Sequence, residues 1–491
     1  MKLTRRNAPG IRKIWMNEGY EKVIISGSLD VTGGFQMLII ISDLHLMDGT
    51  CGKSIPASAF RLFTDRLYEL ALNASWREDG TYRPITEIDI LLMGDILDPL
   101  HSTLWLQTEP GDPGYVRPWT DAGKPEFAAK IKAITSSILI RNAEATGVLK
   151  SLTGEAGIRL PPAGHSGQPD MDSRMREEVS VRLHYMVGNH DWYYHLPGED
   201  FEAIRQKIVE ALGLSNPPGP FPHELSESKD LKDLLASYGV YAQHGDLYDA
   251  FNYSRENGRN ASSLGDAIAV EIINRFPMEA ERRLEELPPA SLERLHDLVN
   301  VRPVLATPLW ISSQLRQNAL GQAEQQKLKN LWNEICDEFL ALSFVQDNNK
   351  PHQWDDVDKL KLALKISNRF SFKTIDEIVV WARKIFSPDE ITYSRYALKE
   401  EAFINHSARF IVYGHTHHHE IVPLDSIPSS PHPINQMYIN SGTWHTYFDL
   451  AINRPEEQKF IPCQVMTYLT FYKNDERIGR CFEVWSGRYS D

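Results

Sequence analysis

The 491-residue sequence has no paired cysteines, no long apolar run and no excess of basic residues. Its four cysteines are isolated and none belongs to a Cys-x-x-Cys pair, so we expect incidental thiols in a reducing compartment rather than disulfides. No run approaches the roughly 20 apolar residues that a membrane-spanning helix needs. The formal charge of −14 disfavours a nucleic-acid partner, because such binding requires clustered Lys and Arg.

No internal repeat and no low-complexity tract is present. A twin arginine stands at Arg5 and Arg6, but the segment that follows is charged rather than apolar, so we expect no export signal. We therefore predict a cytoplasmic protein without a membrane span. The composition, with 42% hydrophobic and 24% charged residues, is typical of a soluble globular protein.

Five apolar runs each end in Asp or His, and most have a glycine beside the polar residue. Each is typical of a short buried strand that leaves polar side chains at its carboxyl end, which is the usual site geometry of an open α/β sheet. Five such endings predict one shared site. The runs are Ile39–His45, Ile90–Asp98, Tyr185–Asp191, Val240–Asp246 and Phe410–His417.

The spread of these runs from residue 39 to residue 417 predicts one α/β catalytic domain with long insertions, although length alone suggests about three domains. Strand signals almost vanish after residue 250, which predicts a mostly helical cap or lid over the site. The alternative is a separate domain that binds a protein partner. The expected boundaries are 36–250 and 406–491 for the core, 101–182 for an insertion within it, 251–405 for the helical insertion and 1–35 for an N-terminal extension.

Apolar residues at helical spacing predict a packing helix over 57–74, and its return to the strand Ile90–Met93 would form a βαβ unit. A long helix is expected at Glu126–Leu149 and a strand at Lys22–Ser26. Further helices are expected at 201–212, 228–237, 265–275, 278–287, 291–299, 321–343, 355–366, 374–385 and 396–404, and a C-terminal hairpin at Met466–Tyr472 and Gly479–Trp485.

The polar side chains at the strand ends comprise two carboxylates, one amide oxygen and four imidazoles, with no thiolate. Such mixed ligands suit borderline to hard divalent ions such as Mn, Fe or Zn. Seven ligands are too many for one ion that keeps an open position, and they fit two ions that share a bridge. In an extended strand, residues two positions apart point to the same side, so we expect Asp43 and His45 to reach one ion. His415 and His417 have the same spacing. The seven predicted metal ligands are Asp43, His45, Asp95, Asn189, His244, His415 and His417.

Asp-x-His, Gly-Asp, Gly-Asn-His-Asp, His and Gly-His-x-His, in this order, resemble the pattern of the calcineurin-like metallophosphoesterase superfamily. All five blocks are present across most of the chain, whereas the two insertions have no counterpart. The resemblance implies a four-layer α/β/β/α sandwich core with two divalent metal ions, for which we expect Mn, with Fe or Zn as alternatives. By position, the ligands would be Asp43, His45 and His417 for the first ion, Asn189, His244 and His415 for the second, and Asp95 as the bridge.

The resemblance also implies a catalytic pair. His190 would donate to the substrate phosphate or protonate the leaving group, and Asp191 would orient His190 by accepting its other N–H. The sequence leaves other roles open: Asp98 would either support a ligand or cap a helix, and lone histidines are expected to be surface or satisfied residues. The open positions are Asp98, Asp246, His418, His419 and His445, and the lone histidines are His101, His165, His296 and His352.

The implied function is hydrolysis of a phosphodiester, pyrophosphate or phosphomonoester by water that two metal ions activate. The His-Gly-Asp at 244–246 with Tyr248-Asp249, and the Asn-Ser-Gly-Thr-Trp at 440–444, are similar to the branch that contains UDP-diacylglucosamine pyrophosphatases, although that branch commonly has Arg in place of His190. We expect a phosphorylated small-molecule or diester substrate. The alternatives are a nuclease of the same superfamily and a non-catalytic scaffold on this fold.

Overall fold

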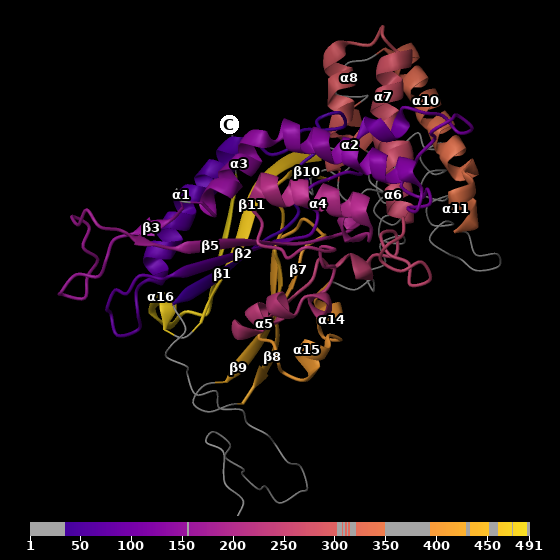
Figure 1. The fold of residues 1–491 in the computed structure, drawn as a ribbon. Helices are drawn as coiled ribbons and strands as arrows, with labels where there is room; N and C mark the ends of the chain where they lie inside the picture. Colours follow the sequence, from indigo (N-terminus) through magenta and orange to yellow (C-terminus); the bar gives the residue numbers. More distant parts are fainter. Residues whose placement is uncertain are drawn as a thin grey trace, which may run out of the picture.

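The computed structural model describes residues 35–154, 157–301, 307, 310–311, 313–314, 321–348, 393–428, 433–450, 460–473 and 475–488. The chain is a mixed α/β protein with several sheets and helices (Figure 1). The strand expected at Lys22–Ser26 and the helices expected at 355–366 and 374–385 lie outside the described residues. Among the described helices, none is both long and apolar enough to cross a membrane.

The larger sheet has six strands, which follow the order β10-β11-β1-β2-β5, with β12 paired to β11. β1, β2 and β5 are parallel to one another, so their carboxyl ends lie at the same edge. The strands are β1 (Gln36–Ile41), β2 (Glu87–Met93), β5 (Ser180–Met186), β10 (Thr446–Leu450), β11 (Phe460–Tyr472) and β12 (Phe482–Arg488).

The smaller sheet has four strands in the order β6-β7-β9-β8, and its first three strands are parallel. A separate pair of two-residue strands, β3 and β4, completes the sheet structure of the described chain. The bounds are β6 (Val240–Ala242), β7 (Phe410–Tyr413), β8 (Glu420–Ile427), β9 (Ile434–Asn440), β3 (Arg159–Leu160) and β4 (Glu177–Glu178).

Helices lie on both sides of these sheets and in a group that projects beyond them (Figure 1). The first part of the chain contributes α1 (Ala57–Ala74), η1 (Thr103–Leu106), α2 (Pro125–Arg141), α3 (Ala143–Leu152), η2 (Trp192–His195), α4 (Glu199–Leu212), η3 (Leu225–Glu227), α5 (Lys229–Ser237) and η4 (Asp246–Tyr248). The later part contributes α6 (Leu264–Ile268), η5 (Ala269–Asn274), α7 (Arg275–Arg283), α8 (Pro289–Leu295), η6 (His296–Asn300), α10 (Gln322–Ala341), α11 (Ser343–Asp347), α14 (Tyr393–Ala397), α15 (Glu401–Ile404) and α16 (Glu476–Gly479).

Side chains of β1 alternate between two apolar clusters because successive residues of a strand face opposite sides. Leu38 and Ile40 pack against residues of the smaller sheet such as Val412, so the two sheets share one buried face. Ile39 lies on the other face and belongs to the cluster that includes Phe63 of α1. That cluster also buries residues of α2, α3 and α4.

Two further clusters complete the packing. The outer face of the smaller sheet buries Tyr413 and Tyr438 with Ala397 of α14. Helices α6, α7, α8 and α10 form an apolar cluster of their own, which also takes in Met47 and Cys51 from the loop after β1. In Figure 1 these helices form the group at the upper right, beyond the ends of the sheet strands. The helical insertion therefore contacts the loop that carries part of the predicted site.

The structure corrects several helix predictions. The helix expected at Glu126–Leu149 is two helices, α2 and α3, which meet at Asn142. The Asn142 side chain donates to the Met47 carbonyl at 2.8 Å, so the break ties these helices to the loop after β1. The helices expected at 265–275 and 278–287 run without a break from α6 to α7. A widened π-helical turn, η5, precedes Pro277, whose missing N–H would interrupt an ordinary helical ladder.

Strand β8 is absent from the sequence predictions, and the reason is its mostly exposed surface. It pairs only with β9 at the edge of the smaller sheet, so no buried apolar run marks it. The C-terminal hairpin is present as β11 and β12, but β12 begins at Phe482 rather than at Gly479. The helix expected at 396–404 is divided into α14 and α15.

Candidate metal centre

The loops that follow the parallel strands are fastened to one another by backbone hydrogen bonds. The Asp43 N–H donates to the Gly94 carbonyl at 3.1 Å and the His45 N–H donates to the Asp95 carbonyl at 2.9 Å, which extends the pairing of β1 and β2 beyond the strands. In the smaller sheet the Gly414 N–H donates to the His244 carbonyl at 2.9 Å. The polar ends of both sheets are therefore held in a fixed register.

Five of the predicted ligands have a left-handed backbone. Among the eight described residues other than glycine with positive φ, five are predicted ligands. Each such residue costs roughly 1–3 kcal/mol, and this kind of strain gathers at functional sites. The five are Asp43 (φ 55°), His45 (43°), Asp95 (54°), His415 (68°) and His417 (63°).

The same observation corrects the reason given for the convergence of Asp43 and His45. Strand β1 ends at Ile41, so the two residues do not reach one ion by alternation along an extended strand. They converge because both adopt the left-handed conformation in the loop after it. The pair His415 and His417, after β7, repeats this geometry.

Asp43, His45 and His417, which we call the first group, are buried and lie close enough to hold one ion. The His417 Nε2 lies 3.5 Å from the Asp43 Oδ1, and the His45 Nε2 lies 3.9 Å from the same oxygen. The two Nε2 atoms face each other at 3.0 Å. Two unprotonated ring nitrogens at that distance would repel, so the arrangement calls for a proton or a cation.

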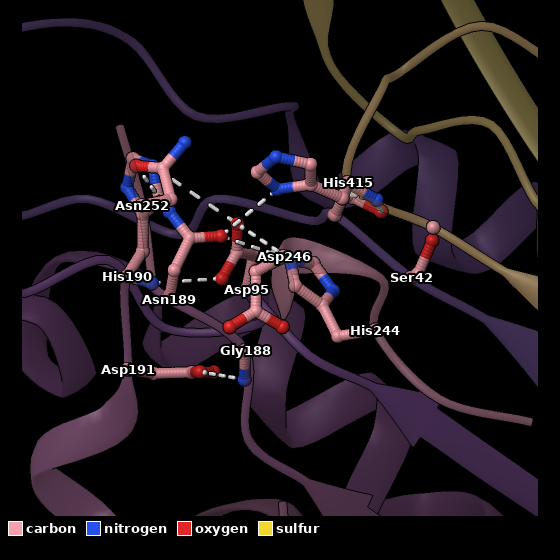
Figure 2. Close-up of polar contacts among 12 residues, drawn as sticks. Ser42, Asp95, Gly188, Asn189, His190, Asp191, His244, Asp246, Asn252 and His415 are labelled. Atoms are coloured by element: carbon pink, nitrogen blue, oxygen red, sulfur yellow. Dashed lines mark hydrogen bonds and ion pairs between the residues drawn. The ribbon is translucent and has the colours of Figure 1, made fainter. Parts of the chain in front are cut away.

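Asn189, His244 and His415, which we call the second group, converge beside Asp95 (Figure 2). The Asn189 Oδ1 lies 3.1 Å from the His244 Nε2 and 3.0 Å from the His415 Nδ1. The Asp95 Oδ2 lies 3.2 Å from the His244 Nε2 and 3.8 Å from the His45 Nε2. Asp95 therefore faces both groups, as a bridging carboxylate would.

Three of the four predicted histidine ligands donate their outer ring nitrogen to an oxygen acceptor. The His45 Nδ1 donates to the Asp98 Oδ2 at 2.8 Å, the His244 Nδ1 to the Met93 carbonyl at 3.2 Å, and the His415 Nε2 to the Asp249 Oδ2 at 3.1 Å. Carboxylate and carbonyl oxygens only accept, so each inner nitrogen keeps its lone pair. Metal-binding histidines in proteins are commonly supported in this way. The residues present therefore fit divalent metal ions.

The electrostatics of the site also favour a cation. Burial alone would lower the pKa of His244, but the Asp95 and Asp43 carboxylates outweigh it and raise the pKa to about 10. Burial raises the pKa of Asp43, although His244 opposes the shift. The acidic groups thus stabilise positive charge, which a divalent ion would supply in place of the proton.

Two glycines allow the carboxylates to approach the strand ends. A Cβ on Gly188 would lie 2.4 Å from the Asp95 Oδ1, and a Cβ on Gly414 would lie 2.6 Å from the Asp43 Oδ2. Both distances are shorter than van der Waals contact. The glycines of the sequence motifs therefore serve close packing around the ligands.

His190 lies beside both groups, but its predicted partner is wrong. The Asp191 carboxylate accepts from the Gly188 N–H at 2.6 Å, the Ile96 N–H at 3.0 Å and the Tyr185 hydroxyl at 2.7 Å. Figure 2 shows its bond to Gly188. These strand-end donors occupy the carboxylate, so Asp191 fixes the turn and does not orient His190.

Asp98 takes the role that was predicted for Asp191. The His190 Nδ1 lies 3.0 Å from the Asp98 Oδ2, while the His190 Nε2 lies 4.0 Å from the Asp95 Oδ2 on the side of the metal ligands. Burial would raise the pKa of Asp98, but His101 and His190 hold it well below its usual range. Asp98 therefore remains an ionised acceptor for His190 and for His45.

His101 was expected to be an ordinary lone histidine, and it is instead a buried neighbour of the site. Its Nδ1 lies 3.3 Å from the Asp98 Oδ1, and its ring stacks on the His190 ring with centroids 5.2 Å apart and an angle of 11°. Its position three residues after Asp98 was the only signal in the sequence. By contrast, His296 contacts Glu281 in the helical insertion, and His352 lies outside the described residues.

The remaining open positions lie around the centre. The His419 Nδ1 donates to the Asn440 carbonyl at 2.7 Å, the His418 ring contacts Tyr447, and Asp246 pairs with Arg259 at 3.0 Å. These contacts give the three residues structural partners near the site.

His445 lies closest to the first group, with its ring 5.8 Å from the His45 ring. It lines a cavity of about 570 Å³, a size typical of small-molecule sites. Phe448 of β10 and Asn300 of η6 also line this cavity, so residues of both the core and the helical insertion border it.

Neither a family model nor a curated protein matches the chain. The functional assignment therefore depends on this geometry.

Proposed function

We propose that this protein is a divalent-metal-dependent phosphoesterase of the calcineurin-like metallophosphoesterase superfamily. The observation that carries the proposal is that the first group and the second group both face one carboxylate, that of Asp95. The first group would hold one ion and the second group another, with Mn as the expected metal and Fe or Zn as alternatives. The apolar clusters between the two sheets and on their outer faces support a four-layer α/β/β/α sandwich.

The chemistry follows from the placement of the ligands and of His190. When bound, two ions would clamp a phosphoryl group, lower the pKa of a shared water and stabilise the attacking and leaving oxygens. His190 would give the proton on its Nε2 to the leaving oxygen as the phosphorus–oxygen bond breaks. Asp98 accepts a hydrogen bond from the His190 Nδ1 and thereby directs Nε2 toward the metal ligands. His190 is thus the proposed catalytic acid.

The substrate is a phosphodiester, a pyrophosphate or a phosphomonoester. His445 lines the cavity and its ring lies 5.8 Å from the His45 ring, so we assign the cavity to the part of the substrate that is not the reacting phosphoryl group. Its lining carries charged side chains of both signs, such as Arg141 and Glu144, together with amide side chains and the aromatic ring of Phe448. This lining favours a polar group over a lipid chain.

The direct test is hydrolysis of bis-p-nitrophenyl phosphate and p-nitrophenyl phosphate by the full chain, with added Mn²⁺ and with a chelator. We expect cleavage that requires the metal and favours the diester. Elemental analysis of the same samples gives the number of ions per chain. Two bound ions without cleavage of either ester would support a scaffold role, and the absence of bound metal would contradict the assignment.

A further inference from the structure

The segment that leads into the helical insertion contacts the second group directly. The Asp249 Oδ2 accepts from the His415 Nε2 at 3.1 Å and from the Asn252 Nδ2 at 2.8 Å. The Asn252 Oδ1 in turn accepts from the Asn189 Nδ2 at 3.3 Å (Figure 2). Two residues that are not among the predicted ligands therefore contact two of the three ligands of the second group.

These contacts decide which atom of each ligand faces the centre. Asn252 binds the Asn189 amide nitrogen, so the Asn189 Oδ1 is directed toward His244 and His415. A flipped amide would present its NH₂ group, which cannot bind a cation. Asp249 binds the proton on the His415 Nε2, which leaves the Nδ1 lone pair on the side of Asn189.

The first helix of the insertion, α6, packs against the segment that carries Asp249 and Asn252. The Gly265 N–H donates to the Phe251 carbonyl at 2.6 Å, and a Cβ on Gly265 would lie 2.1 Å from the Asn252 Oδ1. Asp266, the next residue of α6, accepts from the Trp192 Nε1 at 3.1 Å, close to the Asn189 turn. Helix α6 therefore packs directly against Asn252 and is bonded to the core beside the site.

We propose that Asp249 and Asn252 are positioning residues through which the helical insertion sets the affinity of the second ion. The proposal depends on the proposed function, because it requires two bound ions. The insertion then acts as part of the metal centre as well as a cover over it. Changes in Asn252 or in its contact with α6 should lower the affinity for one ion and leave the affinity for the other unchanged.

The test is calorimetric titration of Mn²⁺ into the metal-free full chain. Wild type is expected to bind two ions. Asn252→Ala should weaken one binding event by roughly 10–100-fold, the usual effect of removing a residue that supports a ligand, and leave the other event unchanged. Asp249→Ala should weaken the same event, and Asp249→Asn should restore part of the affinity because it keeps an acceptor for His415.

A substitution on the insertion side separates positioning from a local loss of a ligand contact. Gly265→Ala should displace Asn252 and lower the affinity for the same ion, although α6 contributes no predicted ligand. Gly147→Ala in α3, where an added Cβ meets nothing within 4 Å, and Asn330→Ala on α10 are matched controls and should bind both ions as wild type does.

The outcomes distinguish this inference from the proposed function. If Asn252→Ala and Gly265→Ala both bind two Mn²⁺ ions with wild-type affinity, the positioning role is overturned and the phosphoesterase proposal stays intact. Equal weakening of both events would also overturn it, because the effect would then be general. If wild type binds no Mn²⁺, the proposed function itself fails. Thermal melting of each variant identifies any that does not fold, and Asp249→Asn, the mildest change, then carries the test.

Discussion

The first and second groups of the candidate centre have similar ligands but different supports. His45 in the first group is held by Asp98, which lies in the loop after β2, and the Asp43 carbonyl accepts from the Thr443 hydroxyl at 2.6 Å. His415 and Asn189 in the second group are held by Asp249 and Asn252, which lead into the helical insertion. Each ligand must be oriented so that its donor atom points inward. The core supplies this support in the first group, whereas the approach to the insertion supplies it for His415 and Asn189 in the second.

Asp95→Asn should abolish the distinction between the groups, because Asp95 faces both of them. An amide cannot supply a bridging negative charge to two cations. We expect loss of both ions and a fall in hydrolysis well beyond the roughly 100-fold upper range that changes in supporting residues cause. Elemental analysis and diester hydrolysis measure the two effects, with Asp172→Asn on the surface as the control. Full metal occupancy in Asp95→Asn would contradict the bridge.

His190→Ala should leave both groups intact while it removes the proposed acid. Turnover should fall by about 100-fold or more, the usual contribution of a general acid, and the number of bound ions should not change. The fall should be larger for an alkyl leaving group than for p-nitrophenolate, which needs less protonation. His296→Ala, in the helical insertion, is the matched control. Equal turnover of an alkyl ester by variant and wild type would remove His190 from the reaction.

Asp98→Asn should be the counterpart of Asn252→Ala. Asp98 supports His45 in the first group. Its replacement should therefore lower the affinity for the first-group ion, which Asn252→Ala leaves unchanged, by roughly 10–100-fold. Turnover should also fall, because the same carboxylate holds His190. Mn²⁺ titration of the two variants and of their combination measures the effect. If both variants weaken the same binding event, the two groups are not supported separately.

The strand ends were predictable because their signal is local. An apolar run that stops at a glycine and an Asp or His marks the end of a buried strand, and all seven predicted ligands do converge in the structure. The helix at 57–74 was predicted for the same reason, since the spacing of its apolar residues is visible within one segment. How these ligands are oriented was not local, because it depends on left-handed backbone at positions such as Asp43 and His415.

The supporting residues could not be predicted because their roles depend on contacts across the fold. Asp98 and Asp191 both follow a predicted strand, and only the direction of each side chain shows that Asp98 is the partner of His190. Asn252 contacts Asn189 while α6 packs closely against it. This close packing is possible because Gly265 has no side chain. No local pattern in the sequence signals such an approach.

The pH dependence of stability offers the smallest and most local test of how the insertion is attached. Asp266 in α6 is buried and accepts from Trp192, Ser262 and Ser263. Burial raises its pKa from the ordinary value of 3.8 to about 6, against the opposing effect of these hydrogen bonds. Between these pH values the folded protein keeps a proton on Asp266 that the unfolded chain releases. The contribution of Asp266 to the free energy of unfolding therefore falls as the pH rises from about 4 to about 6.

Asp266→Asn removes that titration while it keeps an acceptor for Trp192. The free energy of unfolding of wild type should therefore fall, relative to that of Asp266→Asn, by about 2 kcal/mol between pH 4.5 and pH 7. Chemical denaturation of both proteins at the two pH values measures the difference, and shared titrations of the metal ligands cancel in the comparison. A parallel pH dependence of the two proteins would show that Asp266 is not protonated in the fold. The bond between α6 and Trp192 would then not depend on pH, and the attachment of the insertion to the second group would remain constant over this range.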